Sequence, residues 1–159
     1  MREIIHCNDL RSNCKFSLCD CFIEKISVNS DSIVFVFSEG FIVINGTYIR
    51  HSHAGQVRML GLEPDDLSCW IMKRHPTKRG AKLCGKPISI EKLSQLLDRK
   101  KLKIELFAEM YEAYRLHWRG AFYPSEHRRL NTHVVIETIS DSDIELEYTW
   151  DYRNTDGSL

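Results

Sequence analysis

Apolar and polar residues alternate with a period of two along much of this chain, and that period is typical of β-strands. The clearest example is "DIELEYTW" (143–150), where large apolar residues alternate with acidic or polar ones. Three earlier runs are rich in β-branched and aromatic residues and are separated by short polar or glycine turns: "CFIEKISV", "SIVFVF" and "FIVING". These three runs predict an antiparallel meander of three strands.

Further strands are predicted downstream. "LSCWIMK" (67–73) and "YRLHWRGAFY" (114–123) have strand composition, and "HVVIETI" (133–139) is expected to pair with 143–150 as a hairpin. Residues 50–67 contain several turn signals and are predicted to be irregular. The basic stretch 74–88, bounded by proline and glycine, is predicted to be a loop.

One helix is expected after Ser89, which is a good N-cap residue. An apolar stripe then follows with helical spacing at Ile90, Leu93, Leu96 and Leu97. The next segment, 102–114, fits a helical and a strand pattern equally well. We favour a strand, because the helix ends just before this segment and a strand pattern begins just after it.

About eight strands and one helix predict a mainly β (α+β) fold, in which antiparallel meanders form a curved sheet, a sandwich or a small barrel. The 159 residues are expected to form a single domain, 1–159. No apolar run approaches the roughly 20 residues that span a bilayer, and the first residues do not resemble a secretory signal. We therefore expect a cytoplasmic protein that has no membrane partner.

Cysteine and histidine are the residue types that most often bind zinc. On a strand, Cys19 and Cys21 would share one side with Cα atoms about 6.5–7 Å apart, at or beyond the limit for a disulfide. Their simplest role is packing. Neither this pair nor His51 and His53 has further ligands at a zinc-site spacing. We expect no metal and no cofactor.

Signatures of catalysis are also missing from the sequence, which contains no nucleophile elbow, phosphate loop or dinucleotide glycine pattern. Glu105 and Glu109 could form a carboxylate pair. On a strand, however, they would lie roughly 13 Å apart, too far for paired acid–base work on a glycosidic bond. We expect that the protein is not an enzyme.

Charge is unevenly distributed although the net charge is zero. Residues 73–103 contain eleven Lys and Arg against two acidic residues, whereas residues 137–151 contain six acidic residues and no Lys or Arg. The basic segment could bind nucleic acid. We do not expect it to, because its charges would be divided between a loop and a helix and it lacks interleaved aromatics for base stacking.

Three stretches carry a resemblance to known proteins: "LCDCFIEKISVNSDSIVFVFSEGF", "LKIELFAEMYEAYRLHWRGAFY" and "DIELEYTWD". Together they resemble a loose group of small uncharacterised bacterial proteins, and some members of such groups are similar to immunity proteins that neutralise toxins of rival bacteria. Cys19 stands where the group would have a histidine. The resemblance implies a non-catalytic protein that acts by protein–protein contact, and it assigns no catalytic residues.

Two strand faces are candidate partner-binding surfaces. The first carries Arg115, His117, Arg119 and Tyr123, residue types that are frequent in interface hot spots. The second carries acidic residues of the last strand that could oppose a basic cleft, namely Asp143, Glu145 and Glu147. We therefore predict a non-catalytic cytoplasmic binding protein of the immunity type, with a toxin domain as its protein partner. A nucleic-acid binder that uses 73–103 and a small-ligand-binding β-barrel are the alternatives.

Overall fold

The computed structural model of the chain describes residues 2–7, 16–45, 48–112, 115–124, 130, 132–138 and 145–151. These residues form three sheets in which all strand pairs are antiparallel. The five-stranded sheet has the order β1 (Arg2–Cys7), β14 (Glu145–Asp151), β8 (Gly55–Leu60), β5 (Ser32–Phe37), β4 (Lys25–Val28). The six-stranded sheet has the order β10 (Gly80–Ile88), β9 (Leu67–Thr77), β13 (Thr132–Thr138), β12 (Arg115–Pro124), β11 (Leu102–Glu112), β3 (Phe22–Ile23). The three-stranded sheet has the order β2 (Phe16–Ser17), β6 (Ile42–Asn45), β7 (Tyr48–His51).

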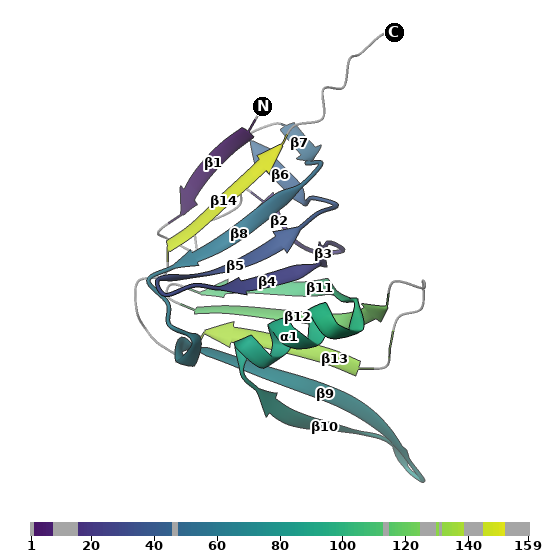
Figure 1. The fold of residues 1–159 in the computed structure, drawn as a ribbon. Coiled ribbons are helices and arrows are strands. Elements are labelled where there is room, and N and C mark those ends of the chain that lie inside the picture. Colours follow the sequence, from purple (N-terminus) through teal and green to yellow (C-terminus); the bar gives the residue numbers. More distant parts are fainter. Residues whose placement is uncertain are drawn as a thin grey trace, which may run out of the picture.

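The two larger sheets are joined edge to edge, because the consecutive strands β3 and β4 belong to different sheets. β3 pairs with β11, and β4, which begins two residues after β3 ends, pairs with β5. Between them, the amide of Glu24 donates to the carbonyl of Val36 at 2.9 Å. Figure 1 shows the result as one curved surface that runs from β1 to β10. The predicted mainly β fold with a curved sheet is confirmed, and the described strands do not close into a barrel.

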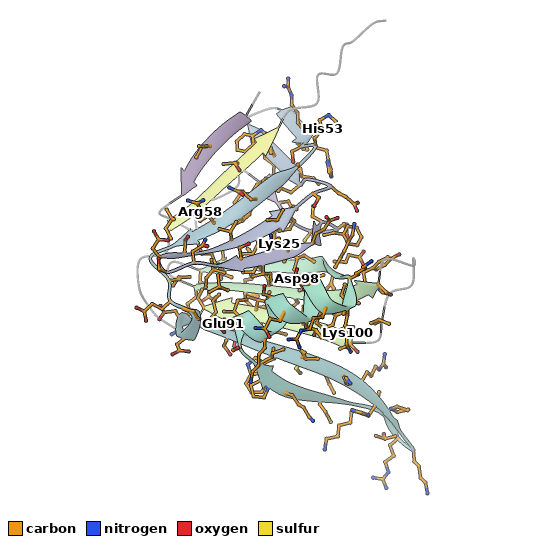
Figure 2. All side chains as sticks on the ribbon, viewed as in Figure 1. Lys25, His53, Arg58, Glu91, Asp98 and Lys100 are labelled. Carbon is orange, nitrogen blue, oxygen red and sulfur yellow. The ribbon has the colours of Figure 1, made fainter. Side chains whose placement is uncertain are left out.

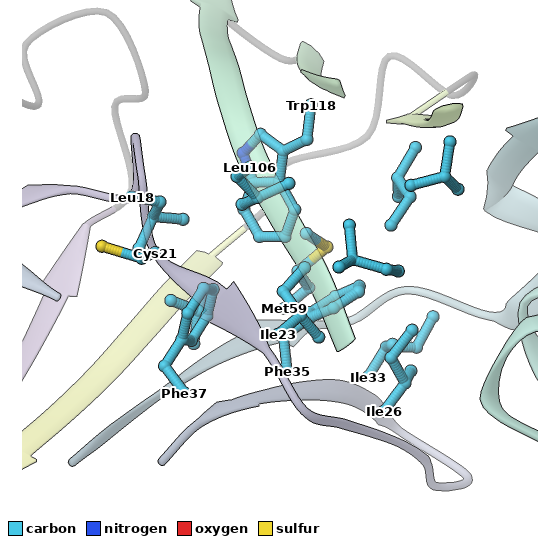
Figure 3. Close-up of a cluster of buried hydrophobic side chains, with 14 of the residues drawn as sticks. Leu18, Cys21, Ile23, Ile26, Ile33, Phe35, Phe37, Met59, Leu106 and Trp118 are labelled. Carbon is cyan, nitrogen blue, oxygen red and sulfur yellow. The ribbon is translucent and has the colours of Figure 1, made fainter. Parts of the chain in front are cut away.

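The hydrophobic core lies where the curvature brings the inner faces of the two larger sheets together (Figure 3). Phe35 on β5 meets Trp118 on β12 edge to face, with ring centroids 5.0 Å apart. Both side chains are fully buried, and Ile23, Met59 and Leu106 lie close by in the same cluster. Burial of this many large apolar side chains is the main source of stability in a fold with little helix.

The helix α1 (Ile90–Lys100) forms as the sequence predicts. The Ser89 hydroxyl accepts a hydrogen bond from the amide of Lys92, and the apolar stripe turns Ile90, Leu93 and Leu97 into the core. Ser94 donates to the carbonyl of Ile26 on β4 at 2.6 Å. The helix is thereby attached to the junction of the two larger sheets, and in the part of the chain that the structure describes no helix could cross a membrane.

Residues 102–112 form the strand β11, which settles the ambiguity in favour of the strand. The strand contains a bulge, because its register with β12 shifts between Leu106 and Ala108. The extra residue is Phe107. As a result, Leu106 faces the core while Phe107 and Ala108 both belong to the opposite face of the sheet.

The predicted three-stranded meander is wrong at its third strand. β4 and β5 pair as expected, but β5 then pairs with β8, and β6 pairs with β2 and β7. Gly40 allows this exit from the sheet, since it has a φ of 83° and a side chain there would collide with the carbonyl oxygen of Ser52. The expectation of irregular structure over 50–67 is also wrong, because part of β7, all of β8 and the first residue of β9 lie within it.

The predicted C-terminal hairpin is wrong as well. The strand β13 lies between β12 and β9, whereas β14 lies between β1 and β8 in the other large sheet. Both segments are strands, as their alternation indicates. Their partners come from distant parts of the sequence, which alternation does not report.

The predicted basic loop 74–88 is instead part of a β-hairpin. The strands β9 and β10 pair along their length around a two-residue turn at Lys78 and Arg79, followed by Gly80 with a φ of 132°. Figure 1 shows the distal half of this hairpin extending beyond the rest of the sheet. We call residues 71–86 of this hairpin the arm.

The strand predicted around Cys19 and Cys21 is interrupted. Cys19 and Asp20 form a turn in which Asp20 has a φ of 62°, and its amide donates to the carbonyl of Leu106 at 2.7 Å. Cys21 is buried in the core, whereas Cys19 is only half-buried. The two thiols therefore do not share one face of a strand.

Candidate protein interface on the outer sheet face

The outer face of the six-stranded sheet is the face directed away from the core. The alternation of β12 places Leu116 and Trp118 in the core, so Arg115, His117 and Arg119 lie on this outer face. Tyr123 lies on the same face nearer the end of the strand. The sequence thus correctly groups these four residues.

The strands on either side of β12 extend this face. Arg119 lies opposite Ala108 on β11 and Val135 on β13, and Val135 in turn lies opposite Trp70 on β9. Side chains from four strands therefore form one row across the sheet. In the next row, Met72 lies opposite His133.

Phe107, the extra residue of the β11 bulge, covers the middle of the outer face. Its ring lies edge to face with that of His133, with centroids 5.5 Å apart, and the guanidinium carbon of Arg119 is 5.9 Å from its centre. A cation–π contact of this kind contributes about 0.5–1 kcal/mol at an exposed site and favours an orientation of the arginine across the ring. Arg119 is thereby positioned for an incoming group.

Large apolar side chains remain exposed on this face. Trp70, Leu83 and Met110 are 36%, 46% and 57% exposed, and they come from β9, β10 and β11. Leu83 pairs with Arg74. Arg74 is four residues after Trp70 on β9 and so lies on the same face, which places Leu83 on that face as well. Single exposed apolar residues are ordinary, but several on one sheet face are typical of a contact surface.

A hollow of about 340 Å³ lies at the end of this face near the β11–β12 connection. Its lining includes Met110, Arg115 and His117, together with Glu137 on β13. His117 Nδ1 and a carboxylate oxygen of Glu137 are 3.0 Å apart. The hollow is open and combines apolar with charged groups, so it can accept a protruding side chain of a partner.

Tyr123 is the least available of the four predicted residues. Its ring packs edge to face on Phe22, with centroids 5.4 Å apart, and Lys103 lies above the same Phe22 ring. Lys103 also forms ion pairs with Glu24 and Glu39. Burial acts to raise the pKa of Glu24, but hydrogen bonds from Lys103 and from the Ser38 hydroxyl outweigh it and lower that pKa. At this end of the face the side chains therefore contact one another, and Tyr123 is less available to a partner.

Glu105 and Glu109 lie on opposite faces of β11, because the bulge lies between them. Glu105 pairs with Ala121 on the outer face, whereas Glu109 points inward, where it accepts hydrogen bonds from the Ser17 hydroxyl at 2.7 Å and the Leu18 amide at 3.1 Å. Glu109 also accepts from Tyr111 at 2.8 Å. These carboxylates cannot act together on one substrate, and Glu109 instead attaches β2 to β11.

The acidic candidates are less well defined. Asp143 lies outside the described residues. Glu145 and Glu147 belong to β14, and the register places Glu147 beside Arg58 of β8, but the described part of the structure does not include their side chains. β14 lies inside its sheet between two partners. Because the side chains of Glu145 and Glu147 are not among those described, the acidic surface stays a prediction.

His51 and His53 do not share one face of a strand. His51 ends β7 and its Nδ1 lies 2.7 Å from the carbonyl oxygen of Ser52, while His53 follows in a bend. Both line an open hollow of about 510 Å³ together with Asp20 and Glu39. Among the described residues, no three His, Cys, Asp or Glu side chains are close enough to hold a metal ion.

Sequence reasoning missed the contribution of the neighbouring strands to the outer face. Trp70 and Met72 alternate with Cys69 and Ile71 in the sequence, and this alternation could have placed them on one face. Phe107 could not have been found, because a bulge has no simple sequence pattern. Comparison of the chain with known protein families, curated proteins and solved structures gives no match.

Proposed function

We propose that this chain is a protein-binding protein whose contact surface is the outer face of the six-stranded sheet. The observation that carries the proposal is the presence on that face of Trp70, Leu83 and Met110, all exposed, around the positioned Arg119. Tryptophan and arginine dominate interface hot spots, and methionine is enriched in interfaces.

The chemistry of the face defines the partner. Trp70 and Met72 can fill an apolar depression, and burying the exposed part of a large aromatic side chain contributes on the order of 1 kcal/mol or more to binding. Arg74 and Arg119 lie on the same face as these apolar groups, and their guanidinium groups can form paired hydrogen bonds with carboxylates of a partner. The expected partner is a folded protein whose apolar patch is bordered by acidic side chains.

Neutralisation of a toxin is one role that such a surface can perform. An inhibitor needs no chemistry of its own, since covering the partner's active surface is enough. Arg119, which the sequence pattern selected, is central to the proposed surface. The immunity-type role follows from the resemblance and stays a prediction, as does the cytoplasmic location.

The test is capture of partners from extracts of the cells that naturally express the chain. The wild-type protein and the double variant Trp70→Ala, Arg119→Ala are immobilised in equal amounts, and bound proteins are quantified by mass spectrometry. A specific partner should be depleted at least tenfold on the double variant. Binding of the purified partner to the wild type and to the double variant is then measured by calorimetry.

The matched control is Arg99→Ala, Lys100→Ala, which removes two exposed side chains from the C-terminal end of α1. It should retain the partner within about twofold, as expected for side chains outside an interface. The proposal fails if every protein captured by the wild type is captured equally well by the outer-face variant. It also fails if the calorimetric affinities of the two proteins are equal.

A further inference from the structure

The β9–β10 hairpin has an unusual charge. Residues 67–88 contain six Lys and Arg and no acidic residue. All side chains from Lys73 to Leu83 are exposed, and Figure 2 shows nitrogen-tipped side chains extending from the distal part of the hairpin. None of these six cations forms an ion pair with a described acidic residue. The hairpin therefore presents uncompensated positive charge in solvent.

The register separates the two faces of the hairpin by chemistry. Trp70, Met72 and Leu83 belong to the outer face, as described above. On the other face Lys86 pairs with Ile71, Lys73 with Cys84, and Lys82 with His75. Each successive row on this inner-side face thus contributes one lysine, and the rows are about 6.7 Å apart along the strands.

The turn extends this basic face. Lys78 and Arg79 lie at the tip, beyond the row formed by Thr77 and Gly80. From Lys86 to Arg79 the chain covers about 23 Å, counted at roughly 3.3 Å per residue. Small residues, Gly80 and Ala81, keep the ribbon narrow near its end. The arm is a slender two-stranded ribbon with a ladder of cations on one side.

We infer that the basic face of this hairpin binds the phosphate backbone of double-stranded nucleic acid. The major groove of B-DNA, about 12 Å wide, admits a two-stranded β-ribbon. Cations along such a ribbon can reach phosphates at almost any register, because a duplex carries one charge per about 1.7 Å of its axis. The face has no aromatic ring apart from the imidazole of His75, so it lacks the stacking platform that single-stranded nucleic acid requires.

This inference reverses the expectation drawn from the sequence. That expectation depended on charges divided between a loop and a helix and on the lack of interleaved aromatics. Pairing of β9 with β10 brings Lys73, Lys82 and Lys86 onto one face. The site is also separate from the proposed protein interface, since the two use opposite faces of the hairpin, and either can hold without the other.

The inference is tested by fluorescence anisotropy with a labelled duplex DNA of 24 base pairs and the full chain. If about four phosphates are neutralised, the affinity should fall roughly 100-fold between 50 and 200 mM salt. The triple variant Lys73→Glu, Lys82→Glu, Lys86→Glu should bind at least 30-fold more weakly at 50 mM salt. Circular dichroism and thermal unfolding establish that each variant is folded.

The matched control reverses the same number of charges at the end of α1 and just after it: Arg99→Glu, Lys100→Glu, Lys101→Glu. It should weaken binding less than fivefold. Equal losses in the two triple variants would mean that net charge alone drives binding, and the assignment to the hairpin would be wrong. Tighter binding to a single strand of the same length, or to vesicles with 30% phosphatidylserine, would equally overturn a duplex site.

Discussion

Replacing Trp118 by alanine should lower the free energy of unfolding by about 3–5 kcal/mol, the range for removing a large aromatic side chain from a packed core. The Trp118 side chain is fully buried against Phe35, and its indole N–H donates to the Tyr111 hydroxyl at 3.2 Å. The substitution therefore leaves a cavity and removes one of the hydrogen bonds of the Tyr111 hydroxyl, which still donates to Glu109. Urea denaturation followed by circular dichroism measures the loss.

Two variants separate these contributions. Trp118→Phe keeps most of the volume and removes only the donor, so it should cost distinctly less than the alanine variant. As a separate control, Trp70→Ala removes a tryptophan that is 36% exposed on the outer face and should cost distinctly less than Trp118→Ala. Equal losses for Trp118→Ala and Trp70→Ala would contradict the location of the core between the two sheets.

Raising the pH from 8 to 10.5 under reducing conditions should lower the free energy of unfolding by about 3 kcal/mol. Burial raises the pKa of the Cys69 thiol to about 12 and that of the Cys21 thiol to about 11, from an ordinary value of 9.0. In the unfolded chain both thiols lose their protons above about pH 9, while in the fold they keep them. The unfolded state then binds fewer protons, so stability falls as the pH rises.

The contribution of Cys69 can be isolated with Cys69→Ala. This variant should be less stable at pH 8 and should lose less stability than the wild type on going to pH 10.5. Cys21 remains in the variant, and burial also raises the pKa of Tyr111 well above its ordinary value, with Glu109 adding to the effect, so a smaller alkaline loss persists. Identical pH dependence in the two proteins would show that Cys69 is not buried in the folded state.

Features set by neighbours in the sequence could be predicted. The helix α1 was found from Ser89 and its apolar stripe, and β5 was found with its observed bounds, because short-range periodicity determines which face of each segment is buried. The strand β12 was found for the same reason, and it supplied Arg119. Alternation reports the burial of a side chain within its own segment, and that is a local property.

Strand partners could not be predicted, because pairing depends on contacts that are distant in the sequence. β5 pairs with β8 across a long excursion through β6 and β7, and nothing in either strand specifies the other. The β9–β10 hairpin was missed for a different reason. Its distal half is exposed on both faces, so it lacks apolar alternation, and its turn residues, Lys78 and Arg79, are not typical of tight hairpins.

The candidate site was predictable in part for the same physical reasons. The outward residues of β12 were recognised, but an interface is built across strands, and the row from Ala108 to Trp70 exists only once β11, β12, β13 and β9 lie in this order. The basic residues were recognised as a group. Their common direction appeared only with the register of the hairpin.

The pairing of β14 with β1 and β8 has a consequence for biosynthesis. Arg2 pairs with Asp151, so the first and last strands of the described chain are neighbours in one sheet. Contacts of such high sequence separation slow folding, because a long loop must close before they form. During translation, β8 has no partner on one side until residues 145–151 leave the ribosome. We therefore expect nascent chains that lack this last strand to expose an open sheet edge and to depend on chaperones.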